Sequence, residues 1–155
     1  MRILFLLAAI LLASPSYAAG ARDAFELINN CAKNKYATPC RVILTPESLT
    51  LFDHFNSYGL AKCLPGDVKF VSATPAPPYS IIRASTSITG QPRTMRLAFI
   101  QNNGGEWKLD VPESLRIGMG QNWKQQVDAM DQLYSYLHKQ LKGGLGCPDL
   151  KNTKQ

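Results

Sequence analysis

Three side chains within one short segment have the chemistry of an acid–base site. Asp53 and His54 are adjacent, and Tyr58 follows His54 by four residues, which on a helix places those two on one face. A carboxylate can abstract a proton while a tyrosine or histidine donates a hydrogen bond to the oxyanion that develops. Asp53, His54 and Tyr58 are therefore the candidate catalytic residues of this sequence.

The surroundings of these three residues favour a solvated helical turn over an active site. Phe52 and Phe55 flank Asp53 and His54, so a helix that buries both phenylalanines must turn at least one of the two polar side chains to solvent or to its flank. No neighbouring residue indicates a shifted pKa. We therefore expect a non-catalytic protein, and a small cavity enzyme that uses acid–base chemistry is the alternative.

Other motifs that carry chemistry are missing from the sequence. No G-x-S-x-G nucleophile motif occurs, and the glycines of "NNGGEW" (102–107) precede a strand-like segment, whereas a phosphate-binding loop opens a helix. Zinc sites need closely spaced ligand pairs such as C-x-x-C, which are absent, and His54 and His138 are far apart. We expect neither a metal ion nor a cofactor.

The four cysteines are better explained as two disulfides than as ligands or nucleophiles, and they are Cys31, Cys40, Cys63 and Cys147. Three pairings are possible. A Cys31–Cys40 bridge would clip the end of a helix to the segment that follows. A Cys63–Cys147 bridge would tie down the C-terminal tail and close a long loop, which removes much unfolded-state entropy. This pairing is the one that we favour.

The first 18 residues have the pattern of an export signal. Met1 and Arg2 form a basic start, residues 3–13 are almost entirely apolar, and Ser16-Tyr17-Ala18 is a small-x-small cleavage site. The apolar run is too short to cross a bilayer comfortably, and no second run follows. We expect a signal peptide over 1–18, cleavage near Ala18, a periplasmic or secreted product, and no transmembrane segment.

The charge of the chain is basic but dispersed. Seventeen basic and 11 acidic residues give a net charge of +6, and loss of Arg2 with the leader would leave +5. Because the basic residues do not form a run, a solvated surface, or attraction to an acidic envelope surface, explains them better than a nucleic-acid groove. The mature length fits a single α+β domain over residues 19–147, followed by a polar tail over 148–155.

Helical periodicity predicts two N-terminal helices and one long C-terminal helix. The first lies within 21–36, and the second begins at Thr45 as N-cap with Pro46 in its first turn and ends at Gly59. The last lies within 121–144, with a narrow apolar stripe that contains Trp123, Val127, Met130, Tyr134, Leu137 and Leu141. We expect this stripe to pack on the domain's own sheet or to form a dimer contact.

Between these helices the apolar residues alternate as in antiparallel strands. Segments 67–73, 79–89 and 94–99 are strand-like, and the proline-rich 74–79 connection must lie in a loop or at an edge. One predicted face contains Ile82, Ala84, Thr86 and Ile88, and another contains Met95, Leu97 and Phe99. Residues 102–105 predict a tight hairpin, after which Trp107, Leu109 and Val111 form a returning strand that Pro112 ends.

The segments "KNKYATPCRVILTPESLTLFDHF" and "GGEWKLDVPESL" resemble the small exported proteins of the nuclear transport factor 2-like (cystatin-like α+β) superfamily. This resemblance spans roughly residues 21–115, and it implies helices packed on a curved sheet in a cone with a cavity. The superfamily includes isomerases and dehydratases, binding modules and subunits of secretion assemblies, so the fold alone leaves the function open.

The leading hypothesis is an exported, disulfide-stabilised and non-catalytic binding protein. We expect its partner, a protein or a small apolar ligand, to bind at the cone cavity or at the C-terminal helix, which could also form a homodimer. The alternatives are a cavity enzyme that acts through Asp53, His54 and Tyr58, and a secretion-system accessory or immunity protein.

Overall fold

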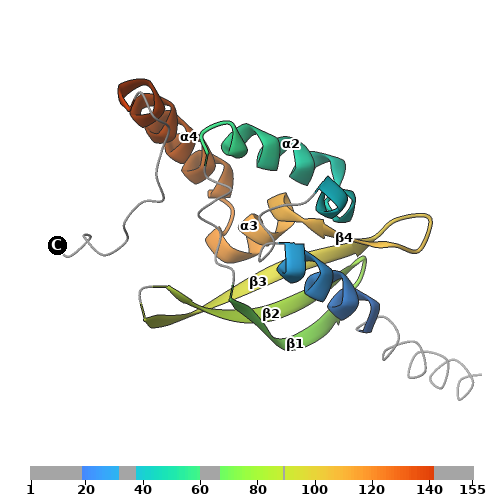
Figure 1. Cartoon of the computed structure of the whole chain (residues 1–155). Helices are drawn as coiled ribbons and strands as arrows, with labels where there is room; N and C mark the ends of the chain where they lie inside the picture. Colours follow the sequence, from blue (N-terminus) through green and yellow to red (C-terminus); the bar gives the residue numbers. More distant parts are fainter. Residues whose placement is uncertain (1–18, 32–37, 60–66, 89, 142–155) are drawn as a thin grey trace, which may run out of the picture.

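A four-stranded antiparallel sheet lies at the centre of the computed structural model, which describes residues 19–31, 38–59, 67–88 and 90–141 (Figure 1). The strands are β1 (Val68–Ala76), β2 (Tyr79–Ile88), β3 (Gln91–Gln101) and β4 (Trp107–Asp110). Their order in the sheet is β1-β2-β3-β4, so each strand pairs with its neighbour in the sequence. The fold class is α+β, as the sequence predicts.

The predicted apolar alternation defines one face of the sheet. Ile82 pairs with Leu97, and the same face of β2 buries Ala84 and Thr86, while β3 adds the fully buried Phe99. These predictions are confirmed. Alternate side chains of a strand lie on the same face of a sheet. On this face a helix covers them, so the face is buried.

The prolines of the 74–79 segment lie at the sheet edge and in a turn. Strand β1 extends through Pro75 to Ala76, and Pro77 and Pro78, joined by a cis peptide bond, connect it to β2. An edge strand tolerates proline because one of its sides forms no ladder hydrogen bonds.

Residues 102–106 form the predicted hairpin turn. The Asn102 side-chain oxygen accepts hydrogen bonds from the backbone N–H groups of Gly104 and Glu106, both at 2.9 Å. Gly105 has a φ of 81°, a left-handed conformation that favours glycine. The stretch is therefore a structural reversal between β3 and β4, as predicted.

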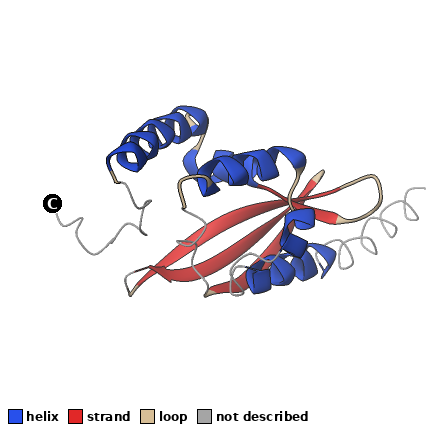
Figure 2. Cartoon of the chain, turned by 45° about the horizontal axis from the view of Figure 1, so that its top comes forward, coloured by secondary structure: helices blue, strands red, loops and turns tan. Residues whose placement is uncertain are grey.

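A helix through residues 19–31 covers the buried face of the sheet (Figure 2). It inserts Ala21, Ala24 and Phe25 into the core, where the Phe25 ring lies 6.0 Å from that of Phe70. Gly20 meets the indole of Trp107 so closely that a Cβ there would lie 2.5 Å from its nitrogen. Cys31 is buried at the end of this described stretch and is disulfide-bonded.

Helix α3 (Val111–Met119) packs on the opposite face of the sheet, and α2 (Pro46–Asn56) and α4 (Trp123–Gln140) pack against α3 (Figures 1 and 2). The 3-10 helix η1 (Thr38–Ile43) lies at the β4 edge, where Ile43 enters the core and Leu44 bridges to Leu109. The N-cap of α2 is Thr45, whose hydroxyl accepts a hydrogen bond from the Ser48 N–H, as its sequence predicts. Ala98 points away from Phe99 and is fully buried next to α3. Among the described residues, no helix is both long and apolar enough to cross a membrane.

Two predictions about the helices are wrong. The sequence interpretation ended β4 at Pro112 and placed no helix directly after it, but α3 begins at Val111, with Asp110 as its N-cap. The long helix α4 was expected to pack on the sheet, yet it lies against α2 and α3, away from the strands (Figure 1). The alternative, a dimer contact, stays a prediction. The helices therefore precede and follow the sheet, with α3 as the link between β4 and α4.

The start of α2 is joined to the start of α3 through one buried hydroxyl. Ser48 is fully buried; its Oγ lies 2.7 Å from the Thr45 hydroxyl and accepts a 2.7 Å hydrogen bond from the Val111 N–H. The first N–H groups of a helix have no partner within the helix, so Ser48 supplies one for α3. We call this arrangement the Ser48 junction.

Replacement of Ser48 by alanine tests the junction. We expect Ser48→Ala to lower the free energy of unfolding by about 1–3 kcal/mol, because the partly buried Val111 N–H loses its acceptor. Urea unfolding followed by circular dichroism measures the change. Thr50→Ala, an exposed position on the same helix, is the control and should change stability by less than about 0.5 kcal/mol. Equal effects of the two substitutions would contradict the role of Ser48.

Candidate functional site

The structure separates Asp53 from the other two candidate catalytic residues. Its carboxylate accepts two hydrogen bonds of 2.6 Å from the Arg41 guanidinium, and both side chains are exposed. The hydrogen bonds from Arg41 lower the pKa of Asp53. Asp53 is therefore a paired surface carboxylate, with its oxygens directed at Arg41 rather than at His54.

His54 and Tyr58 converge on a carboxylate that the sequence interpretation did not select. One oxygen of Asp131, on α4, lies 2.6 Å from His54 Nε2 and accepts a 2.8 Å hydrogen bond from the Tyr58 hydroxyl. The bond to Asp131 raises the pKa of Tyr58, which keeps the phenol protonated as the donor. The same contacts, first with Tyr58 and then with His54, lower the pKa of Asp131. We call these three residues the Asp131 cluster.

Aromatic contacts continue the Asp131 cluster along the interface between α2 and α4. The Phe55 ring meets Tyr134 edge-on at 6.2 Å between centroids, and Tyr58 lies 5.7 Å from the His138 ring. Edge-to-face pairs at such distances are favourable packing geometries. The cluster thus holds α4 against α2. His54 and Tyr58, two of the candidate catalytic residues, therefore have a structural role.

The predicted apolar stripe of α4 is only partly the face that packs. Val127 is buried and Tyr134 is half-buried, whereas Met130 and Leu141 are exposed. Asp131 lies one helical turn from both Val127 and Tyr134, on the side that meets α2. Asp131 could have been selected from the sequence because it is a carboxylate on the packing side of an amphipathic helix.

An apolar groove lies beside this interface, lined by residues of α2, α3 and the start of α4. It has a volume of about 420 Å³, opens widely to solvent, and is lined by Glu47, Thr50, Leu51, His54, Pro112 and Trp123. Of the candidate catalytic residues only His54 reaches it. Glu47 is the carboxylate of this lining, and neither Asp53 nor Tyr58 is among the described residues that line the groove.

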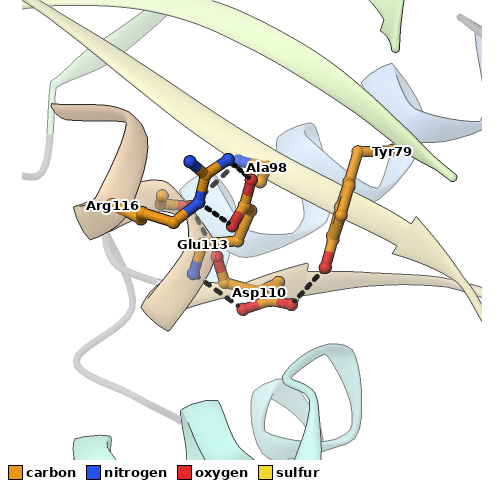
Figure 3. Close-up of polar contacts among 6 residues, drawn as sticks. Tyr79, Ala98, Asp110, Glu113 and Arg116 are labelled. Carbon is orange, nitrogen blue, oxygen red and sulfur yellow. Dashed lines mark hydrogen bonds and ion pairs between the residues drawn. The ribbon is translucent and has the colours of Figure 1, made fainter. Parts of the chain in front are cut away.

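A second polar cluster marks the start of α3 (Figure 3). Asp110 accepts a 3.0 Å hydrogen bond from the Glu113 N–H and a 3.2 Å hydrogen bond from the Tyr79 hydroxyl. Burial, followed by the charge of Asp110, raises the pKa of Tyr79. Asp110 therefore acts as a helix cap that is fastened to strand β2.

The remaining groups of this second cluster are also engaged in structural contacts. Ser114 donates a 2.6 Å hydrogen bond to the Asp110 carbonyl and accepts one of 2.9 Å from the Ala98 N–H. Glu113 forms a bidentate ion pair with Arg116 at 2.5 and 2.6 Å, which lowers the pKa of Glu113 (Figure 3). The cluster secures α3 to strands β2 and β3 through Tyr79 and Ala98.

Exposed apolar side chains occur along α4 and at its C-cap. Met130, Leu133, Tyr136 and Leu141 retain 38%, 54%, 61% and 48% of their accessible surface, and we call them the α4 apolar face. Met130, Leu133 and Tyr136 follow one another at three-residue steps on α4, and Leu141 is its C-cap. Single exposed apolar residues are ordinary, whereas a group of them is less common on a protein surface. The charges of α4 do not oppose apolar contact, because Lys124 and Lys139 balance Asp128 and Asp131.

Of the four cysteines, Cys31 is the one whose side chain lies among the described residues. Cys31 is disulfide-bonded, while the side chains of Cys40, Cys63 and Cys147 lie outside the described ones, so the pairing stays a prediction. Within the described ranges, no three histidine, cysteine, aspartate or glutamate side chains form a group that could hold a metal ion.

The Asp131 cluster predicts a specific response to acid. The pKa of Asp131 is lower in the folded protein than its ordinary value of 3.8. The contacts of the ionised Asp131 with Tyr58 and His54 therefore stabilise the attachment of α4 to α2 at pH values above 3.8. This stabilisation is lost as the pH falls through the pKa that Asp131 has in the folded protein, because the carboxylate becomes protonated. We expect near-ultraviolet circular dichroism of the native protein to lose part of its tyrosine signal in this range. Asp131→Asn should lack that step.

Asp128→Asn is the matched control for Asp131→Asn, since Asp128 is an exposed carboxylate on the same helix. It should retain the acid step of the native protein. If the titration curves of the two variants coincide, Asp131 does not hold α4 on α2.

Comparisons with known proteins assign no family to this chain. No protein-family model, no curated protein and no solved structure matches it. The resemblance to the nuclear transport factor 2-like superfamily therefore stays a prediction. What the protein does has to be inferred from its own geometry, in which the Asp131 cluster is architectural and the α4 apolar face is uncovered.

Proposed function

We propose that this chain is a non-catalytic protein-binding module and that its partner packs the apolar side of a helix against the α4 apolar face. The observation that carries this proposal is the group of exposed apolar side chains on a helix whose other side is already fixed. Partners that contain an amphipathic helix commonly bind by this mode. A secretion-assembly subunit and a toxin are partner classes compatible with it.

The attachment of α4 to α2 favours binding at this surface. The Asp131 cluster and the Phe55–Tyr134 contact order the helix before any partner arrives. Binding to a surface that is already ordered loses less conformational entropy than binding to a mobile segment. Trp123, at the start of the same helix, adds an aromatic side chain of the type that often dominates binding energy.

A partner protein explains the surface better than a small apolar ligand or a substrate. Small-molecule sites are usually concave and enclose most of the ligand, whereas the apolar residues here project from a helix and the groove beside them is open. An acid–base enzyme needs a base that faces its substrate. Asp53 is bound to Arg41, and the Asp131 oxygen is shared by His54 and Tyr58.

The compartment in which the module acts is proposed from the sequence. Residues 1–18 have the export pattern, which supports a periplasmic or secreted protein, although they lie outside the described residues. In such a compartment disulfides are stable, and Cys31–Cys40 and Cys63–Cys147 are the pairs that we propose. The cone shape of the nuclear transport factor 2-like superfamily is likewise proposed rather than observed.

Site-specific photo-crosslinking tests this function. We replace Leu133 with the photoreactive amino acid p-benzoylphenylalanine, express the full chain in the source cells, irradiate and identify the adducts by mass spectrometry. We expect one predominant protein adduct, cross-linked through a segment with helical apolar periodicity. Leu133→Asp should weaken binding of that partner by at least about tenfold, because it places a charge in an apolar contact.

Val71 provides the matched control, since it is an apolar residue on β1 that is 49% exposed, close to the 54% of Leu133. Photoreactive substitution at Val71 should give no such adduct, and Val71→Asp should leave the affinity unchanged. Two results would contradict the proposal. One is the same set of adducts from both positions, and the other is an adduct that contains only a second copy of this chain.

A further inference from the structure

Two arginines face each other across the open part of the sheet. Arg83 on β2 is the direct partner of Arg96 on β3 in the antiparallel register, and both are exposed. They alternate with the buried Ile82 and with Leu97, so they lie on the face opposite the helix of residues 19–31. Figure 1 shows β2 and β3 continuing past α3 toward the turn that joins them.

The neighbouring positions on this face add a third cation and several hydroxyl groups. Lys69 on β1 pairs with Ser85, which lies two residues from Arg83 on the same side of β2. Ser72 is opposite Arg83, and Thr94 is opposite Ser85. We call the group of Lys69, Arg83 and Arg96 the basic face.

The basic face has no acidic partner among the described residues. The ion pairs of this region, within the described ranges, join Glu113 to Arg116 and Glu106 to Lys108. In the part of the chain that the structure describes, neither Asp67, two residues before Lys69, nor Asp110, opposite Ala98 on β3, forms an ion pair with the basic face, and Asp110 caps α3. Like charges directly opposite each other on neighbouring strands destabilise a sheet, so a bound anion would relieve a repulsion that is built into the fold.

We propose that the basic face binds a phosphate monoester group carried by a soluble molecule. Side chains directly opposite on antiparallel strands have Cβ atoms about 5 Å apart, close enough for both guanidinium groups to reach one anion. Guanidinium groups bind phosphate through paired hydrogen bonds. A monoester has up to two negative charges and three free oxygens, which suits two arginines, a lysine and nearby hydroxyl donors. This inference does not depend on the α4 apolar face.

The composition of the basic face favours a monoester over polymers and lipids that contain phosphate. Its neighbours Ser72, Ser85 and Thr94 offer no aromatic ring on which a nucleic-acid base could stack. The apolar neighbours of the basic face are the half-buried Ile81, two residues before Arg83, and the exposed Val71, next to Ser72, which is less apolar surface than entry into a lipid layer requires. A small phosphorylated molecule requires neither feature.

Titration with glycerol 3-phosphate tests the inference. Amide chemical shifts of the full mature protein are recorded while glycerol 3-phosphate replaces sodium chloride at constant ionic strength. We expect saturable shifts centred on residues 83–85 and 94–96. Arg83→Gln should weaken binding by about tenfold or more, because charge-assisted hydrogen bonds are lost. Arg96→Gln is the second variant and should do the same if Arg83→Gln does not fold.

Arg93→Gln is the matched control. Arg93 is exposed on the same strand as Arg96, but it pairs with Thr86 and lies on the opposite face of the sheet. Its replacement removes an equal charge and should leave the affinity for glycerol 3-phosphate unchanged. Without ligand, Arg83→Gln should also raise or maintain the melting temperature, because the repulsion between Arg83 and Arg96 is gone.

Three results would overturn the inference. The first is the absence of saturable shifts relative to chloride. The second is an equal loss of affinity in Arg93→Gln and Arg83→Gln, which indicates general attraction by net charge. The third is binding to phosphatidylglycerol vesicles or to a single-stranded oligonucleotide without binding of glycerol 3-phosphate, because these contain phosphodiesters.

Discussion

The buried hydroxyl of Ser48 is the contact on which the arrangement of helices depends. It joins the first turn of α2 to the first N–H group of α3, and α3 in turn leads into α4. Ser48 supplies the acceptor for the first N–H group of α3 and the Asp110 cap supplies the acceptor for the Glu113 N–H, so α3 can begin directly at the end of β4. The junction contributes to the position of α4 through α3, together with the Asp131 cluster, which holds α4 on α2.

The polar residues that could have formed an active site instead complete this architecture. Asp53 pairs with Arg41, Asp131 receives His54 and Tyr58, and both sets of contacts lie on the surface of α2. They fix one side of α4 and leave its apolar face free. The proposed protein-binding surface therefore belongs to the helical layer, while the sheet presents a separate cationic surface through Arg83 and Arg96.

The strands, the 102–106 hairpin and the start of α2 could be predicted because their signals are local. Alternation placed Ile82 and Phe99 in the core, and Thr45-Pro46 marked the helix start. Helix α3 has a comparable signal in Asp110, Pro112 and Glu113, but the apolar alternation of β4 was extended through Val111 and concealed it. Pro112 ends the strand by opening a helix.

The candidate site was less predictable because its decisive contact is not local. His54 and Tyr58 could be placed on one helical face from their spacing, but Asp131 lies 77 residues from His54, and no periodicity connects the two. The pairing of Arg83 with Arg96 likewise depends on the register of two strands, which the turn between them sets. Such contacts require the tertiary structure.

Amide hydrogen exchange in the Ser48→Ala variant tests most directly whether the Ser48 junction positions α4. The account predicts faster exchange throughout α3 and α4, with the amides of β2 and β3 exchanging at their native rates, because the helical layer loosens while the sheet remains intact. Exchange in α4 as slow as in the native protein would contradict it, since α4 would then hold its position without the junction.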